Sequence, residues 1–449
     1  MSGAMIRPMT RAAALLAASL LLTGIGGTAL STADPVTTTS PVGASPAPET
    51  VTDACPYQTT PVPPVDESEV VPAGDTTPAP LPVPDPPIGG DELGACGVVL
   101  AAGAAPAPEG LTSAAWLIAD LTSGTVLAAK DPHGRYRPAS TIKVLLALVV
   151  LDELDLDDTV LGTQADDEVE GDAAGVGPGG TYTVHDLLTG LMLVSGNDCA
   201  NALARKLGGT EATLEKMNAM AAHLGAQDTR AASASGLDAP GMSTSPYDEA
   251  VIFRAAMQNP DFVEISEQDQ ARFPGYPGMP TETPSASDGG NSTETVPETT
   301  PTGDRGIDLY NMNQLLYDYE GTVAGKTGYT DDARKTFVGV AERDGRQILV
   351  VQMYGLNDSY GSYWRQAEAL LDYGFAQPAD QNIGVLIDGP DDLIEELSES
   401  DPPGTGDNAS ADDLTSDGLS GTAKLTIGLI GTLIVVALVY AGLRLGKRS

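Results

Sequence analysis

Apolar and polar positions between residues 114 and 373 alternate in a way that predicts an α+β domain. Two apolar runs, 115–118 and 126–129, are separated by a polar turn, which is typical of a pair of antiparallel strands. A second pair, 336–340 and 347–354, flanks Asp344-Gly345, a dipeptide that favours a hairpin turn. Apolar residues recur with helical spacing in five further ranges, 142–154, 184–194, 198–207, 211–224 and 363–373. We therefore expect an antiparallel sheet of about five strands, built from both ends of the domain, with a mainly helical second subdomain.

Three segments lack the apolar periodicity that a buried core requires. Residues 34–108 are dominated by Pro, Thr, Ser, Ala and Asp, which predicts an extended, disordered stalk. Residues 377–421 are acidic and are expected to form a spacer. Residues 273–305 interrupt the folded region with a Thr- and Pro-rich sequence, which predicts a long disordered surface loop. The folded domain is therefore expected over residues 109–376.

Apolar segments at the two ends of the chain predict export and anchoring. Residues 1–33 combine Arg7 and Arg11 with an apolar run and small residues before Asp34, which is typical of a cleaved secretory signal peptide. An uncleaved N-terminal anchor is the alternative. Residues 425–443 contain no charge and are long enough for a transmembrane helix, and the basic tail 444–449 marks its cytoplasmic end. We expect a single-pass protein of the cell membrane whose folded domain lies on the extracytoplasmic face.

Charge and cysteine content narrow the classes of partner. The chain has 62 acidic and 23 basic residues, a formal net charge of −39, so nucleic acid is not expected as a partner. Cys55 and Cys96 flank a proline-rich stretch and, in an exported protein, either pair or stay free. Cys199 lies in an apolar helical pattern and is expected to be a small buried residue. No Cys and His cluster has metal-ligand spacing, so we expect no metal and no cofactor.

Three short motifs predict a serine acyl-transfer site whose base is a lysine. In chain order they are Ser140-Thr141-Ile142-Lys143, Ser195-Gly196-Asn197 and Lys326-Thr327-Gly328. Each motif is short enough to occur by chance. The complete set in this order is much more specific, because penicillin-binding proteins and β-lactamases share it.

The first two motifs supply the groups that would move protons. Ser140 is expected as the acyl nucleophile in the first turn of a helix, where free N–H groups favour an oxyanion. Lys143 lies one helical turn further on, so its amine can reach the Ser140 hydroxyl as general base. Apolar neighbours and a nearby cation would lower its pKa enough for this role. Ser195 is expected to relay a proton to the leaving amine, and Asn197 to hold the Lys143 amine and the substrate amide.

The third motif supplies groups that suit a free carboxylate. It is expected on a strand that edges the cleft. Lys326 would act by its charge and Thr327 by its hydroxyl, while Gly328 would let a substrate backbone approach closely. The charge of Lys326 would also help to keep Lys143 neutral.

The chain resembles the serine-type D-alanyl-D-alanine carboxypeptidases, which are low-molecular-mass penicillin-binding proteins of the penicillin-interacting serine transpeptidase-like family. Besides the three motifs, the resemblance rests on residues 137–140 (RPAS), 177–184 (GPGGTYTV), 194–198 (VSGND), 235–241 (SGLDAPG), 319–330 and 333–339. It covers residues 114–373 and none of the predicted stalk, spacer or anchor. It implies a β-lactamase/transpeptidase-like fold.

The resemblance also implies an activity. A peptidoglycan stem peptide ending in D-alanyl-D-alanine would acylate Ser140 and release its terminal D-alanine, and the acyl-enzyme would then be hydrolysed, in cell wall remodelling. The backbone N–H groups of Ser140 and Tyr329 would form the oxyanion hole. β-Lactams would act as covalent inhibitors.

Other activities on the same motifs remain alternatives. A class A β-lactamase needs a glutamate to activate the deacylating water, and residues 230–241, where it is expected, contain none. A D,D-endopeptidase or transpeptidase would use the same site, and so would a catalytically weak penicillin-binding sensor of the cell wall. The chain departs from the family pattern in its long 273–305 segment and in the lack of a β-rich second domain after the last helix.

Overall fold

The computed structural model describes residues 55–279, 306–356 and 362–389. All of them belong to the second of two units into which the chain divides, Thr50–Ser449. The predicted signal peptide, transmembrane segment and basic tail lie outside the described residues, as do 280–305 of the predicted loop and 390–421 of the predicted spacer. Within the described part, no helix has the length and apolarity needed to cross a membrane.

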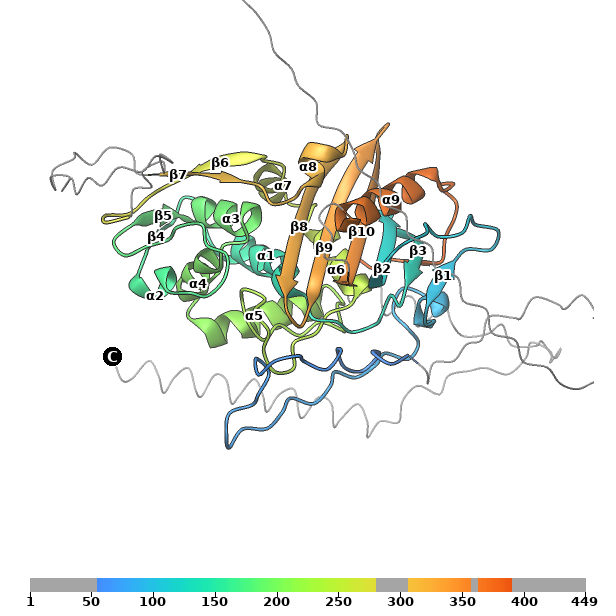
Figure 1. Cartoon of the computed structure of the whole chain (residues 1–449), viewed down its shortest axis with the longest axis horizontal. Coiled ribbons are helices and arrows are strands. Elements are labelled where there is room, and N and C mark those ends of the chain that lie inside the picture. The colour runs from blue at the N-terminus through green and yellow to red at the C-terminus, as the bar shows by residue number, and fades with distance from the viewer. Residues whose placement is uncertain (1–54, 280–305, 357–361, 390–449) are drawn as a thin grey trace, which may run out of the picture. The chain divides into compact units, whose positions relative to one another are not determined.

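An antiparallel sheet with the strand order β1-β3-β2-β10-β9-β8 forms the centre of the fold, and β11 pairs with β3 (Figure 1). Its strands are β1 Val98–Leu100, β2 Ser113–Asp120, β3 Thr125–Lys130, β8 Thr322–Thr330, β9 Arg334–Arg343, β10 Arg346–Gly355 and β11 Gly384–Val385. The early strand β2 pairs directly with the late strand β10, so that Leu117 lies opposite Val351. The prediction of a sheet built from both ends of the domain is thus confirmed, with the short strands β1 and β11 in addition to the five long ones.

Both faces of the sheet are covered, which explains the near-continuous apolar runs of its central strands. Side chains alternate between two cores, because successive residues of a strand point to opposite faces. Trp116 and Ile118 belong to the core that packs against α9 (Ser362–Ala376), whereas Leu117 packs into the larger core on the other face. The larger core holds α1 (Lys143–Glu153) and α6 (Pro246–Ala256).

The remaining helices form the second subdomain beyond α1, together with two small hairpins (Figure 1). Its elements are β4 Thr159–Leu161, α2 Gln164–Asp167, β5 Thr181–Thr183, α3 Val184–Leu193, α4 Asn197–Lys206, α5 Thr210–His223, α7 Pro260–Ser266, β6 Gln270–Phe273 and β7 Ile307–Tyr310. The short helix α8 (Leu315–Asp318) lies beside β8 instead, and its Leu315 belongs to the core that packs against α9. Local sequence signals set several helix starts. The Thr183 side chain accepts a hydrogen bond from the Asp186 N–H at the start of α3. At the start of α6, the Ser245 side chain accepts one from the Asp248 N–H.

The predicted stalk is wrong for residues 55–108, which pack on the domain. Cys55 and Cys96 form a disulfide with their Cα atoms 5.6 Å apart, so the pairing that the sequence left open is made. The segment also contains a short 3-10 helix, η2 (Asp91–Gly94), and strand β1. We call residues 55–96 the strap. Hydrogen bonds between its backbone and buried side chains of the domain hold it, and composition alone does not reveal such bonds.

The predicted spacer is also wrong at its N-terminal end. Residues 377–389 belong to the fold, because β11 pairs with β3 and the side chains of Ile383, Leu386 and Ile387 are buried. The first residue of the predicted loop, Phe273, is the last residue of β6, which pairs with β7.

Candidate active site

The start of the central helix places Ser140 and Lys143 together. A short 3-10 helix, η3 (Ala139–Ile142), leads into α1, and Lys143 is the first residue of α1. The backbone of Ala139 has a φ of 47°, which is the left-handed region. A residue other than glycine adopts this conformation only when its surroundings hold it there. Lys143 Nζ lies 2.7 Å from Ser140 Oγ, 2.7 Å from Asn197 Oδ1 and close to the Ser235 carbonyl oxygen.

The electrostatic setting of Lys143 suits a general base. The side chain is fully buried. Burial lowers the pKa of Lys143 well below its usual value, and the neighbouring charge of Lys326 lowers it further. Burial also lowers the pKa of Lys326 to about 7. An amine in this setting can be neutral at physiological pH, and only a neutral amine can take the proton of a serine.

Ser195 and Asn197 come from the turn between α3 and α4. Ser195 is buried with a φ of 61°, and its hydroxyl has no hydrogen-bond partner among the described residues. A strained residue with a free buried hydroxyl is typical of a functional site. Asn197 donates from Nδ2 to the Glu170 carbonyl at 2.7 Å, which leaves Oδ1 facing Lys143. The next residue, Asp198, accepts hydrogen bonds from the N–H groups of Ala174, Gly175 and Val176 and so anchors the start of α4.

Strand β8 carries the third motif along the edge of the sheet, as expected. Lys326 is buried, and its Nζ donates to the Thr327 carbonyl at 2.6 Å. A Cβ on Gly328 would lie 2.3 Å from Thr336 Oγ1 and 2.7 Å from the Ser140 nitrogen. Gly328 therefore allows β8 to lie directly against the nucleophile, a closer approach than the sequence indicated. Tyr329, the next residue, is exposed and donates from its hydroxyl to Asp331.

A cleft of about 560 Å³ opens between these elements. It is lined by Ser140, Asp172, Ser195, Met312, Thr327, Gly328, Tyr329, Lys335, Thr336, Tyr363 and Trp364. The structure thus brings the residues of all three motifs to one place, with Lys143, Asn197 and Lys326 buried behind the lining. The catalytic roles assigned to them from the sequence stay predictions.

Several residues at the site were missed by the sequence analysis. The Ser235 carbonyl contacts Lys143, and a Cβ on Gly236 would lie 1.9 Å from the Ala139 oxygen. Ser235 and Gly236 lie in the 235–241 segment that carries part of the family resemblance, so the sequence did contain a signal for them. Asp172 and Trp364 line the cleft without a motif to reveal them.

Two groups of potential metal ligands occur in the described part of the chain, and neither lines the cleft. One includes Cys55 and Cys96, which are joined in the disulfide. The other is a buried set of His133, Asp228 and Asp248, in which His133 Nδ1 lies 2.8 Å from Asp228 Oδ2. In each group two of the three side chains are already joined to each other, Cys55 to Cys96 and His133 to Asp228.

Comparison with known proteins decides the family. Residues 102–356 match the model of the D-alanyl-D-alanine carboxypeptidase family. The chain is 47% identical over 288 residues to D-alanyl-D-alanine carboxypeptidase DacB2 of Mycobacterium tuberculosis, an alignment that covers 64% of this chain and 89% of the relative. The chain belongs to the D-alanyl-D-alanine carboxypeptidase family. The predicted resemblance is confirmed.

Other members of the family and their structures agree with this assignment. The chain is 30% identical over 284 residues to carboxypeptidase DacD of Salmonella typhimurium, covering 60% of this chain and 64% of the relative. The crystal structure of a D-alanyl-D-alanine carboxypeptidase from Mycobacterium tuberculosis matches with a TM-score of 0.56 at 47% identity, over 64% of this chain and 100% of that chain. A mutant DD-transpeptidase from Streptomyces matches with a TM-score of 0.52 at 26% identity, over 60% and 100% respectively. The expected α+β, transpeptidase-like fold is confirmed.

Proposed function

We propose that this chain removes the terminal D-alanine from peptidoglycan stem peptides through an acyl-enzyme on Ser140. The observation that carries the proposal is the buried amine of Lys143, which lies 2.7 Å from Ser140 Oγ and whose pKa is lowered by burial. Membership of the carboxypeptidase family and the 47% identity to a carboxypeptidase support the choice of reaction.

In the acylation step, Lys143 takes the hydroxyl proton as Ser140 Oγ attacks the carbonyl carbon of the penultimate D-alanine. The N–H groups of Ser140 and Tyr329 stabilise the negative charge that develops on the carbonyl oxygen. The bond to the terminal D-alanine then breaks, and its nitrogen receives a proton through Ser195, whose hydroxyl faces no other partner among the described residues. Asn197 Oδ1 keeps the Lys143 amine in place throughout.

Recognition of the terminal carboxylate uses the β8 side of the cleft, and deacylation uses Ser140 and Lys143 again. Thr327 lines the cleft and offers its hydroxyl to the terminal carboxylate, while the buried Lys326 supplies positive potential from behind the strand. After D-alanine leaves, water attacks the ester, and Lys143 again accepts the proton before Ser140 Oγ is released. β-Lactams would acylate the same oxygen.

We also propose that the catalytic domain lies on the extracytoplasmic side of the cell membrane, with the C-terminal apolar segment as its anchor. The support is the sequence of residues 1–33 and 425–443, together with a disulfide, which is typical of oxidising compartments. A substrate in the cell wall would be within reach of a domain placed there.

The test is release of D-alanine from a synthetic stem peptide ending in D-alanyl-D-alanine, with the full chain and a Ser140→Ala control. Release that benzylpenicillin blocks and Ser140→Ala lacks is the expected result. The similarity to a DD-transpeptidase makes transfer a second candidate. Including an amino-group acceptor separates the two, because a transpeptidase would give a cross-linked product in place of the trimmed peptide. Failure of the wild-type chain to release D-alanine would refute the proposal.

A further inference from the structure

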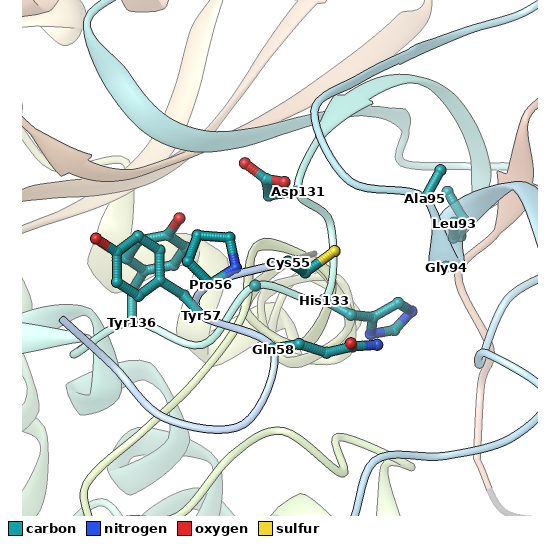
Figure 2. A pocket seen from close by; sticks show the side chains of 11 residues that line it. Cys55, Pro56, Tyr57, Gln58, Leu93, Gly94, Ala95, Asp131, His133 and Tyr136 are labelled. Atoms are coloured by element: carbon teal, nitrogen blue, oxygen red, sulfur yellow. The ribbon is translucent and has the colours of Figure 1, made fainter. Parts of the chain in front are cut away.

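The segment that leads to the nucleophile is bonded to the strap along most of its length. Residues 131–137 end three residues before Ser140. The backbone N–H of Arg135 donates to the Tyr57 carbonyl at 2.7 Å, and the Tyr57 ring lies 5.6 Å from that of Tyr136 (Figure 2). Directly after the strap, the N–H of Gly97 donates to the Asp131 carboxylate, and the Asp131 N–H donates to the Gly97 carbonyl. The strap therefore packs along residues 131–137, which lead directly to Ser140, and not on a remote surface.

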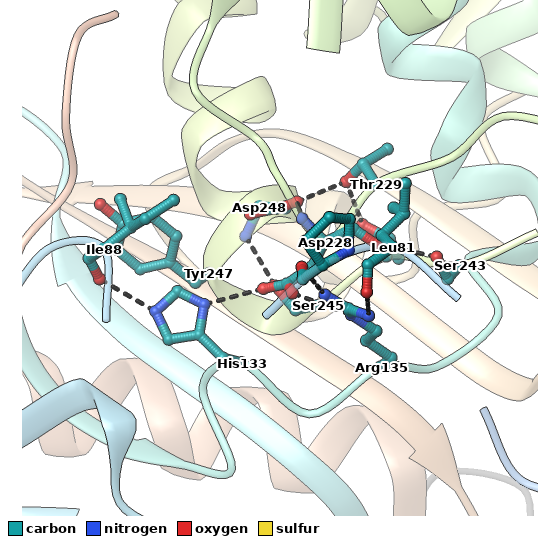
Figure 3. A network of polar contacts seen from close by, with 12 residues as sticks. Leu81, Ile88, His133, Arg135, Asp228, Thr229, Ser243, Ser245, Tyr247 and Asp248 are labelled. Atoms are coloured by element: carbon teal, nitrogen blue, oxygen red, sulfur yellow. Dashed lines mark hydrogen bonds and ion pairs between the residues drawn. The ribbon is translucent and has the colours of Figure 1, made fainter. Parts of the chain in front are cut away.

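Arg135 is the main buried anchor of this contact. Its guanidinium is fully buried and donates to three strap carbonyls, those of Thr59 at 3.2 Å, Leu81 at 2.6 Å and Pro82 at 2.7 Å. It also donates to Asp228 Oδ1 at 2.9 Å, which pairs on its other side with His133 (Figure 3). A buried guanidinium needs such partners, because leaving a buried charge without them is costly. This network ties two parts of the strap, at residue 59 and at residues 81–82, to the domain.

Residues 62–69 of the strap contact two buried side chains, Arg137 and Asp332. On one side, Arg137 donates to the Glu69 carboxylate and to the Val62 carbonyl, the latter at 2.6 Å. On the other side, Asp332 accepts from the N–H of Val65 and from the Ser68 hydroxyl, the latter at 3.0 Å. Arg137 and Asp332 are both buried, each with only 3% of its surface exposed. Residues 62–69 therefore link two buried charged side chains that come from different parts of the chain.

These two side chains lie next to the proposed oxyanion donors. Arg137 comes three residues before Ser140, and Asp332 comes three residues after Tyr329. The two backbone segments also meet directly, because Thr336 Oγ1 donates to the Pro138 carbonyl at 2.7 Å. The strap adds a second, outer connection between them. Two donors that must converge on one oxygen lose effect when either shifts by a fraction of an ångström, so a second connection has catalytic value.

We propose that strap residues 62–69 are a positioning element of the active site. They hold Arg137 and Asp332 at a fixed separation and thereby fix the N–H groups of Ser140 and Tyr329 relative to each other. They act through these segments and do not touch the substrate. The disulfide between Cys55 and Cys96 closes the strap and limits how far it can move from the domain. This inference rests on the proposed acyl-transfer function.

The test compares variants of the full chain that loosen the strap at different places. Asp332→Ala removes both carboxylate oxygens that accept from Val65 and Ser68. Asp332→Asn keeps one oxygen, which can accept from the Val65 N–H. Ser68→Ala removes only the hydroxyl bond and is the milder variant should Asp332→Ala fold poorly. Arg230→Ala is the matched control, because Arg230 donates to the strap carbonyl of Ala79 at 2.9 Å and contacts neither Glu69 nor Asp332.

Each variant is measured in three ways: the rate constant of acylation by benzylpenicillin, kcat and KM for D-alanine release, and Tm. We expect Asp332→Ala to lower the acylation rate constant and kcat about tenfold or more, with a smaller change in KM. Ser68→Ala should lower acylation about two- to threefold, and Asp332→Asn should restore most of the rate lost in Asp332→Ala. Arg230→Ala should acylate at the wild-type rate even if its Tm falls.

Two outcomes would overturn the inference. If every strap variant acylates at the wild-type rate while Tm falls, the strap only stabilises the fold. If Arg230→Ala slows acylation as much as Asp332→Ala does, the effect is a general loosening rather than positioning. The wild-type and Ser140→Ala chains test the proposed function independently of the strap. If the proposed function is wrong, the wild type itself does not release D-alanine, whatever the strap variants do.

Discussion

A buried glutamate beside the nucleophile gives a quantitative test of the structure. Glu249, on α6, is 1% exposed, and its Oε1 lies 2.9 Å from the hydroxyl oxygen of Thr141, the residue after Ser140. The Thr141 hydroxyl also lies 2.8 Å from the Pro138 carbonyl, which can only accept. A protonated Glu249 can donate to Thr141 while Thr141 donates to Pro138. Burial raises the pKa of Glu249 to about 8.

The raised pKa makes stability depend on pH with a definite sign. In the unfolded chain a glutamate titrates near 4.5, so between that pH and about 8 the folded state binds more protons. The free energy of unfolding therefore falls as pH rises through this range. With about 1.36 kcal/mol per pH unit, the loss from this group between pH 5 and pH 7 is on the order of 2 to 3 kcal/mol. Glu249→Gln keeps the shape and the hydrogen bonds but does not titrate.

The assay is urea unfolding of wild type and Glu249→Gln at pH 5, 6 and 7. All other titrating groups are common to both chains, so they cancel in the difference between the two unfolding free energies. That difference should shift in favour of the variant by roughly 2 to 3 kcal/mol from pH 5 to pH 7. Glu342→Gln, an exposed glutamate on β9, is the control and should give no such shift. A difference for Glu249→Gln that stays constant across the three pH values would refute the reasoning.

Three further predictions follow from the site and the strap. Lys143→Ala should slow acylation by benzylpenicillin about 100- to 10,000-fold, since it removes the base; a near wild-type rate in stopped-flow assays would contradict the assignment. Lys326→Met removes a charge that lowers the pKa of Lys143, so the acidic limb of the acylation pH profile should move to higher pH. An unchanged profile would show that Lys326 does not act on Lys143. Deleting residues 55–96 should abolish soluble, folded protein, because Arg135 and Arg137 lose buried partners; normal activity after this deletion would mean that the strap is dispensable.

The sequence predicted the parts of the fold that depend on periodic apolar positions. Residues 115–118 and 347–354 were expected as strands and lie in β2 and β10, which pair at the centre of the sheet. The motif residues were expected in one site, and the Lys143 amine does lie within hydrogen-bond distance of both Ser140 Oγ and Asn197 Oδ1.

The strap could not be predicted in this way. Its few apolar residues give no periodic signal, and it is held by carbonyl groups, such as those of Leu81 and Pro82, that bond to the buried Arg135. Every residue has a carbonyl, so composition does not distinguish one that will be bonded. Likewise β1 and β11 are too short to give a pattern of their own, and they exist because β3 offers them an edge. The signal peptide and the membrane anchor stay predictions.

The central claim is that Ser140 is the acylated residue, and mass spectrometry tests it most directly. The full chain and the Ser140→Ala variant are incubated with benzylpenicillin and digested, and the adduct is located by peptide sequencing. We expect one penicilloyl group, on the Ser140 oxygen of the wild type, and none on the Ser140→Ala chain. An adduct on any other residue, or one of equal yield on the Ser140→Ala chain, would contradict it.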